Sequence, residues 1–137
     1  SMLKDACNAL VALAIMQYTN RAKPAEKLTR AETVTKAFKA HLEQHFSAVK
    51  APSDYAQRMH LSTAYLNECV RGVTGQPVSQ HIQARIILEA MRLLQYSALS
   101  VREIAAALGY DDHTYFSRLF SKAAGMSALS FRNKNRD

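Results

Sequence analysis

The feature that most constrains the fold of this chain is an internal repeat of about 50 residues. Ala56 returns as Ala105 after 49 residues, and Gly75 returns as Gly125 after 50 residues. The matched positions are Tyr55-Ala56, Met59, Leu61, Tyr65-Leu66, Cys69-Val70 and Gly75 in the first copy, and Ile104-Ala105, Leu108, Tyr110, Tyr115-Phe116, Leu119-Phe120 and Gly125 in the second. Each copy predicts two short helices that cross closely at a small alanine, which is a helix-turn-helix. We therefore expect an all-α fold with two helix-turn-helix units.

Start and stop signals define the second unit, at about residues 100–125. Ser100 is a good N-cap with Glu103 at the capping-box position. Gly109 permits a sharp left-handed turn, after which Asp111 or Asp112 caps a second helix. That helix is expected to run to about Ala124, with an inner face of Tyr115, Phe116, Leu119 and Phe120.

The first unit, at about residues 52–75, follows the same plan. Pro52 or Ser53 opens a short helix that runs through Met59, and Ser62 caps a helix from Thr63 to about Thr74. Its inward residues are expected to be Tyr65, Leu66, Cys69, Val70 and Val73. His60 stands where the second unit has Gly109, so a left-handed residue is expected there; histidine tolerates that conformation better than most residues.

Two further helices surround these units. Thr29 and Glu32 form a second capping-box pattern, which predicts a helix to about Ser47. Residues 79–96 have an apolar stripe of helical period and predict one long connecting helix between the units. Together, residues 29–137 are expected to form one domain.

Residues 1–28 have a different character. A helix is predicted over residues 3–22, apolar on more than one face, before a polar break around Pro24. Such a helix either packs inside its own domain or forms an interface with another domain or a second chain. We expect residues 1–28 to be an interdomain or dimerisation helix with a linker, and a homodimer would use residues 3–20.

Composition limits the class of partner. The chain has 137 residues, 48% of them hydrophobic, a formal charge of +7 and a pI of about 9.7. This charge fits nucleic acid, although an acidic membrane surface or solubility alone would fit it as well. Its cysteines, Cys7 and Cys69, are expected to be reduced thiols in a cytosolic protein. No apolar run is long enough to cross a bilayer.

An enzyme is a poor interpretation of the sequence. His41 and His45 are spaced i, i+4, which suits zinc, but Glu43 lies one place later than the H-E-x-x-H pattern requires. No third ligand, glycine-rich phosphate loop or nucleophile-base set is evident. We therefore expect no catalytic residues, no metal and no cofactor.

The residue identities of the second unit point to a protein family. Ile104-Ala105, Leu108-Gly109-Tyr110, Asp112, Tyr115-Phe116, Arg118, Phe120, Gly125 and Phe131-Arg132 resemble the second helix-turn-helix of the AraC/XylS family of transcription regulators. The resemblance extends from about Thr29 to Arg132, and departs from the family at Ser127-Ala128, where Thr-Pro is usual. It implies a bacterial regulator that inserts two recognition helices into successive major grooves of double-stranded DNA and positions RNA polymerase nearby, as an activator does. It also implies a cytoplasmic, nucleoid-associated protein with a separate small-molecule-sensing domain, of which nothing is visible before Leu3.

Matching positions in the family imply the DNA-contacting residues. His113, Thr114, Ser117 and Arg118 of the second unit, and Thr63, Ala64, Asn67 and Glu68 of the first, would face bases. Asn67 suits adenine, Arg118 suits guanine or a phosphate, and Glu68 suits cytosine but repels phosphate. Arg71, Arg102 and Lys122 would hold phosphates, together with backbone N–H groups at the starts of both recognition helices.

Other side chains have simpler roles. The aromatic residues Tyr65, Tyr115, Phe116 and Phe120 are expected in the core rather than stacked on bases. Arg85 and Arg132 are expected to pair within the protein.

One alternative belongs to a different class. The chain could be a helical protein-interaction module built around apolar residues 3–16, with an incidental basic surface. Salt separates the two, because binding to several phosphates weakens steeply with salt and an apolar interface does not.

Overall fold

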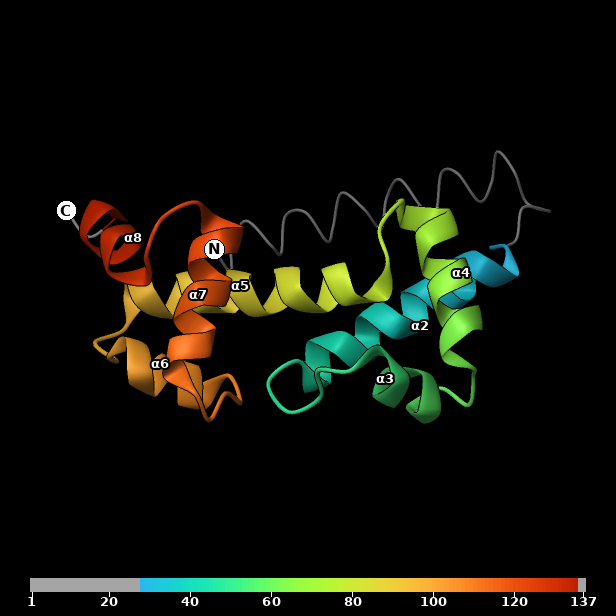
Figure 1. Cartoon of the computed structure of the whole chain (residues 1–137). Coiled ribbons are helices and arrows are strands. Elements are labelled where there is room, and N and C mark those ends of the chain that lie inside the picture. The colour runs from blue at the N-terminus through green and yellow to red at the C-terminus, as the bar shows by residue number, and fades with distance from the viewer. Residues whose placement is uncertain (1–27, 136–137) are drawn as a thin grey trace.

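The computed structural model describes residues 28–135, and all regular structure within that range is helical (Figure 1). The helices are α2 (Arg30–His45), α3 (Pro52–Arg58), α4 (Thr63–Thr74), α5 (Val78–Tyr96), α6 (Val101–Ala107), α7 (His113–Ala124) and α8 (Ala128–Asn135). The all-α prediction is confirmed, with two helix-turn-helix units, α3–α4 and α6–α7, joined by α5. The predicted helix at 3–22, its interdomain or dimer role and Cys7 lie outside the described residues.

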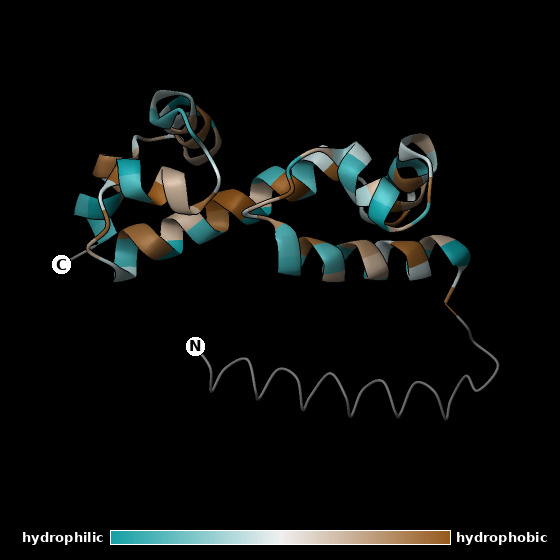
Figure 2. Ribbon diagram, turned by 90° about the horizontal axis from the view of Figure 1, so that it is seen from below, coloured by the Kyte–Doolittle hydropathy of each residue, from teal (hydrophilic) through white to brown (hydrophobic). Residues whose placement is uncertain are grey.

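The molecule is arranged along α5. Helices α2 to α4, here called the first half, lie at the beginning of α5, and helices α6 to α8, the second half, lie at its end (Figure 1). Hydrophobic and hydrophilic residues interchange along the helices, as the hydropathy colouring shows (Figure 2). Ile82, Ile86, Ala90 and Leu94 of α5 are almost fully buried and belong to one apolar cluster with both halves.

The predicted helix starts are present in the structure. Both capping boxes form: Thr29 exchanges hydrogen bonds with Glu32, and Ser100 exchanges them with Glu103. Asp112, rather than Asp111, caps α7 with its side chain. Satisfying the free N–H groups of the first turn in this way favours helix initiation at these positions.

Both turns use a left-handed residue, as expected from the repeat. Gly109 has a φ of 86°, and His60, at the corresponding place in the first unit, has a φ of 58°. A side chain in this region is uncommon, and histidine is one of the residues enriched there. The turn therefore keeps its geometry in both units although the residue differs.

Two residues predicted to point inward do not. Tyr115 is 50% exposed and Val73 is 44% exposed. Each unit is small: the buried residues of α4 are Leu66, Cys69 and Val70, and those of α7 are Phe116 and Phe120. The buried stripe is consequently narrower than the run of apolar residues, and the neighbours at its edge remain in solvent.

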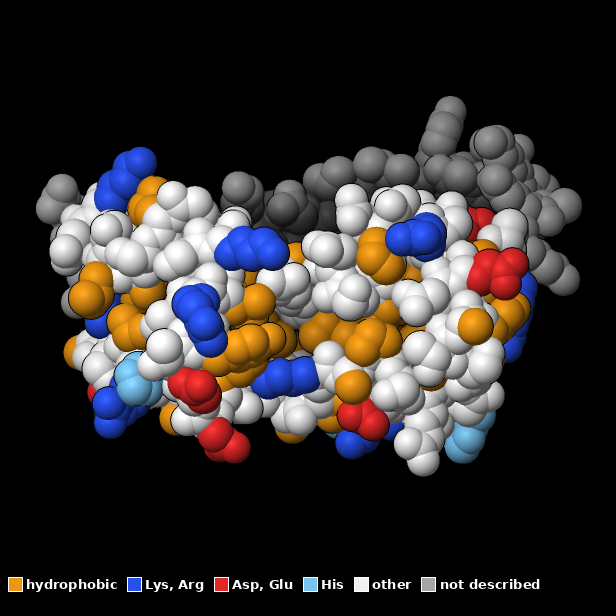
Figure 3. Space-filling view, in the orientation of Figure 1, with side chains coloured by type: hydrophobic (Ala, Val, Ile, Leu, Met, Phe, Trp, Pro, Cys, Tyr) orange, Lys and Arg blue, Asp and Glu red, His pale blue; other side chains and the backbone are white. Residues whose placement is uncertain are grey.

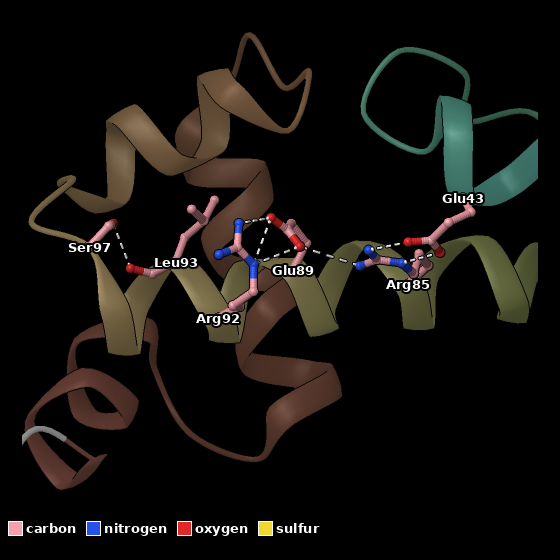
Figure 4. A network of polar contacts seen from close by, with 6 residues as sticks. All are labelled: Glu43, Arg85, Glu89, Arg92, Leu93 and Ser97. Carbon is pink, nitrogen blue, oxygen red and sulfur yellow. Dashed lines mark hydrogen bonds and ion pairs between the residues drawn. The ribbon is translucent and has the colours of Figure 1, made fainter. Parts of the chain in front are cut away.

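The predicted internal pairing of Arg85 is confirmed. Its guanidinium donates two hydrogen bonds of 2.8 Å to the Glu43 carboxylate and lies near Glu89, which in turn pairs with Arg92 (Figure 4). Arg132 is likewise engaged within the protein, donating from Nε to the Leu94 carbonyl at 2.9 Å. These arginines stabilise the fold around α5.

Candidate nucleic-acid interface

The second helix of each unit, α4 or α7, is the recognition helix of a helix-turn-helix. Each has 12 residues and ends at a left-handed glycine, Gly75 or Gly125. Figure 1 shows the two helices pointing in nearly the same direction at different places along α5. The repeat in the sequence thus becomes two similarly presented helices on one support.

In α7 the residues predicted to face DNA occupy two adjacent rows. Thr114 and Arg118 are exposed, and their i, i+4 spacing places them on one face. His113 and Ser117 form the neighbouring row and are partly buried. All four predicted residues therefore reach the surface of α7, with Thr114 and Arg118 the most accessible.

In α4 the corresponding rows are less suited to anions. Ala64 and Glu68 are the exposed pair, and Thr63 and Asn67 are partly buried. An acid and a methyl group thus occupy the places where α7 presents arginine and threonine. The exposed row of α4 offers no cation opposite a phosphate until Arg71 in its last turn.

Asn67 is engaged inside the protein. Its Oδ1 accepts a hydrogen bond of 3.0 Å from the Val78 N–H, the first of α5. The residue at the N-cap of α5 is Pro77, whose side chain cannot cap. Asn67 therefore supplies the cap from the preceding helix, and the oxygen that pairing with adenine requires is already bonded.

The backbone amides at the start of α7 are also largely used. Asp112 Oδ1 accepts from the N–H groups of Thr114 at 2.9 Å and Tyr115 at 3.2 Å. Its carboxylate places negative charge where a phosphate would lie. In α4, Ser62 Oγ accepts from the Tyr65 N–H and carries no charge. A phosphate thus meets less competition at the start of α4 than at the start of α7.

The three predicted phosphate-binding side chains are all exposed. Arg71 and Lys122 lie in the last turns of α4 and α7, and Arg102 lies in the first turn of α6. Figure 3 shows one face of the molecule, on which Lys and Arg side chains are dispersed around an apolar hollow between the two halves. The face therefore offers separate cations rather than one dense basic patch.

The hollow contains a residue that the sequence analysis placed in the core. Tyr115 lines it together with Lys50, Tyr110 and Leu119. Half of its surface is open, and its ring lies 6.0 Å from the ring of Tyr110. Its exposure depends on tertiary packing, which the apolar pattern does not specify.

The remaining aromatic predictions are confirmed for the core. Phe116 and Phe120 have no exposed surface, and Tyr65 is partly buried against the same apolar cluster. A buried ring cannot stack on a base.

Catalytic or metal-binding arrangements are not evident in the part of the chain that the structure describes. The rings of His41 and His45 stack with centroids 6.3 Å apart, but no group of three or more His, Cys, Asp or Glu side chains within residues 28–135 could hold a metal ion. Over the same range no helix combines the length and apolar character needed to span a membrane.

Comparison with known proteins agrees with this geometry. A family model described as a helix-turn-helix domain matches residues 55–134. The MmsAB operon regulatory protein of Pseudomonas aeruginosa is 35% identical over 97 residues, which cover 71% of this chain and 32% of that protein. The transcriptional activator RhaR of Yersinia pestis is 27% identical over 124 residues, which cover 90% of this chain and 42% of that protein.

Solved structures share the fold. The C-terminal domain of AraT, a response regulator from Geobacillus stearothermophilus, superimposes with a TM-score of 0.73 at 25% identity, covering 80% of this chain and 91% of that one. The DNA-binding domain of AdpA, solved in complex with a target DNA, gives a TM-score of 0.67 at 24% identity, covering 73% and 90%.

The matches also define what part of a regulator this chain resembles. It spans between 32% and 42% of the length of the curated relatives named above, and nearly the whole of the isolated domains whose structures are known. Two helix-turn-helix units on one connecting helix, together with these matches, show that the chain belongs to the AraC/XylS family of transcription regulators.

Proposed function

We propose that residues 29–137 form a sequence-specific DNA-binding domain that inserts α4 and α7 into successive major grooves. The observation that carries the proposal is the pair of similarly directed recognition helices on one connecting helix, α5 (Figure 1). Helix α5 has 19 residues, and at 1.5 Å per residue it spans about 28 Å. With the widths of the units added, this is of the order of one turn of B-DNA, roughly 34 Å.

In the second unit, Thr114 and Arg118 are the principal base-facing residues because they are the most exposed. A guanidinium can bind the O6 and N7 atoms of guanine, or a phosphate. His113 and Ser117 contact the flanking bases or sugars from the adjacent row. The α7 amides are not used for phosphate, since Asp112 occupies two of them.

In the first unit, we assign base contacts to Thr63, Ala64 and Glu68, and a structural role to Asn67. Ala64 suits a thymine methyl group, and Glu68 can accept from cytosine N4. This unit contributes less affinity than the second, because Glu68 is repelled by nearby phosphates. Arg71, Arg102 and Lys122 are assigned to phosphates.

The wider setting follows from the relatives. Those relatives are longer, and one of them is named a transcriptional activator. We propose that the domain works in the cytoplasm on nucleoid DNA, together with a small-molecule-sensing domain and RNA polymerase. Residues 1–28 would serve as the interdomain helix and linker or, through residues 3–20, as a homodimer contact.

The test compares two arginine variants in binding to a duplex recovered by selection. Arg118→Ala should weaken binding about five- to 150-fold, the usual loss for one bidentate base contact of about 1–3 kcal/mol. Arg30→Ala removes an equal charge from the exposed start of α2 and should change affinity less than threefold. Equal effects of the two variants would contradict the assigned interface.

Salt dependence separates this function from a protein-interaction module. The logarithm of the binding constant should fall linearly with the logarithm of salt concentration, with a slope of about −0.9 for each phosphate contacted. Three phosphate contacts would give a slope near −3. A flat salt response would favour the interaction module.

A further inference from the structure

The helices of the two halves pack on α5, and two short connections bring the halves into direct contact. Residues 46–51 join α2 to α3 in the first half, and residues 108–110 form the turn of the second unit. We call the contact between these two segments the interunit contact.

Lys50 is the centre of the interunit contact. Its ammonium donates to the Phe46 carbonyl at 3.2 Å and the Ser47 carbonyl at 3.0 Å in its own segment. It also donates to the Leu108 carbonyl in the other half at 2.5 Å, and it lies 4.7 Å from the centre of the Tyr110 ring. The same cation thus binds backbone oxygens from both halves and an aromatic face.

The backbones meet directly beside this lysine. A Cβ atom added to Gly109 would lie 2.1 Å from the Ser47 carbonyl oxygen, closer than real Cβ contacts. The glycine therefore serves two needs, a left-handed turn and a close approach between halves. A larger residue there would force the two segments apart.

Residues 46–51 are fixed to the first half and to α5 by side-chain contacts. The buried Tyr55 hydroxyl donates to the Val49 carbonyl at 2.7 Å, and burial raises the pKa of Tyr55 to about 12. Arg85 of α5 lies 4.1 Å from the centre of the Phe46 ring and binds Glu43 with two hydrogen bonds (Figure 4). Lys50 is consequently presented from a fixed base rather than from a free loop.

A local role for Lys50 does not account for all its contacts. Its bonds to Phe46 and Ser47 satisfy carbonyls after the end of α2, which a capping lysine would do in any helix. The bond to Leu108 and the contact with Tyr110 reach a segment 58 positions further along the chain. Capping of α2 requires neither of them.

We propose that Lys50 is a positioning residue that locks the second unit onto the first and thereby sets the spacing of the two DNA half-sites that the domain accepts. This inference rests on the proposed function. One added base pair moves a half-site by about 3.4 Å along the DNA axis and rotates it by about 35°. If the second unit moved by this much relative to the first, the donor–acceptor distance between Lys50 and Leu108 would exceed the roughly 3.2 Å limit of a hydrogen bond. The bond would therefore break.

The variant is Lys50→Met, which keeps much of the side-chain length and removes the donor. Lys36→Met, at an exposed site on α2, is the matched control for the loss of charge. Both are measured on duplexes that carry the two selected half-sites at the preferred spacing and at one base pair more or less. A duplex with only the second half-site is included.

Wild type and Lys36→Met should lose about tenfold or more in affinity at the altered spacings, as expected when one helix can no longer make its base contacts. Lys50→Met should lose less than about threefold, while its affinity for the single half-site remains that of Lys36→Met. An unchanged spacing preference in Lys50→Met would overturn the proposal.

A second measurement needs no DNA. Spin labels at Gln57→Cys and Ala106→Cys, exposed and repeat-related positions on α3 and α6, report the distance between the units in the whole chain with Cys7 replaced by serine. The distance distribution should be narrow in wild type and broad in Lys50→Met. Equal widths would refute the lock, and a narrow wild-type distribution without specific DNA binding would refute only the proposed function.

Discussion

Replacing Asn67 by alanine tests whether this residue reads adenine or holds α5 in place. Its Oδ1 accepts from the first N–H of α5 at 3.0 Å, and the Pro77 side chain offers no alternative cap. Loss of a side-chain cap costs about 1 kcal/mol, within a range of 0.5–2. For a domain of this size that corresponds to a fall in melting temperature of about 4–8 °C.

Asn67→Asp sharpens the test, because aspartate keeps the acceptor and adds a negative charge at a helix N-terminus, where it is stabilising. Its melting temperature should stay close to wild type, whereas Asn67→Ala should be clearly lower. Ser117→Ala, at the repeat-related position of α7, is the matched control and should have little effect on stability. Thermal unfolding followed by circular dichroism at 222 nm measures all three.

The same variants discriminate between the two roles in DNA binding. If Asn67 is structural, Asn67→Ala folded at low temperature should retain the base preference of the first half-site in a selection experiment. An unchanged melting temperature combined with lost adenine preference would refute the reasoning from the hydrogen bond. Equal destabilisation by alanine and aspartate would refute the assignment of Oδ1 as the cap.

Two further predictions concern stability. Gly109→Ala and Gly125→Ala both introduce a side chain at positive φ, a cost of about 1–2 kcal/mol, but of the two only Gly109 has a neighbour in the way, Ser47. Chemical denaturation should therefore show a larger loss of unfolding free energy for Gly109→Ala. Equal losses would contradict the close approach of the two segments. Hydrogen bonding from Arg85 lowers the pKa of Glu43 below 4.5, so its ionised form in the folded state stabilises the protein above pH 4.5, and this contribution is lost as the pH falls. The Glu43 side chain is 63% exposed, so Glu43→Gln should cost at most about 1 kcal/mol at pH 7. Melting curves of variant and wild type should converge in acid, and a gap that persists at low pH would contradict this.

Local signals in the sequence predicted most of the fold. A capping box needs only two residues three positions apart, so Ser100 with Glu103 could be recognised without any tertiary information. The left-handed turn at His60 followed from its register with Gly109, and the structure confirms it. Helix order, the two units and the long connecting helix all depend on patterns of this short range.

Features that depend on packing could not be predicted in the same way. The apolar pattern placed Tyr115 in the core, but half of its surface is exposed. The bond between Asn67 and Val78 depends on how the chain turns through the intervening residues. The contact of Lys50 with Leu108 joins segments 58 positions apart and appears only when both halves are in place on α5.

The residues predicted to face bases came from matching positions in the AraC/XylS family, and half of them are exposed in the structure. Thr114, Arg118, Ala64 and Glu68 lie on the surface because residues four apart share a helix face. The sequence did not predict the hydrogen bonds that some of these groups make within the protein. Such bonds remove Asn67 and two α7 amides from the proposed interface.

Selection of this chain against a library of random duplexes at moderate salt tests the central claim most directly. Two recognition helices on one rigid helix predict recovery of two short half-sites about one helical turn apart, roughly 10–10.5 base pairs. The half-site of the first unit should be the less strongly enriched, because Glu68 lies on its exposed row. Recovery of no motif above bulk DNA would contradict the account.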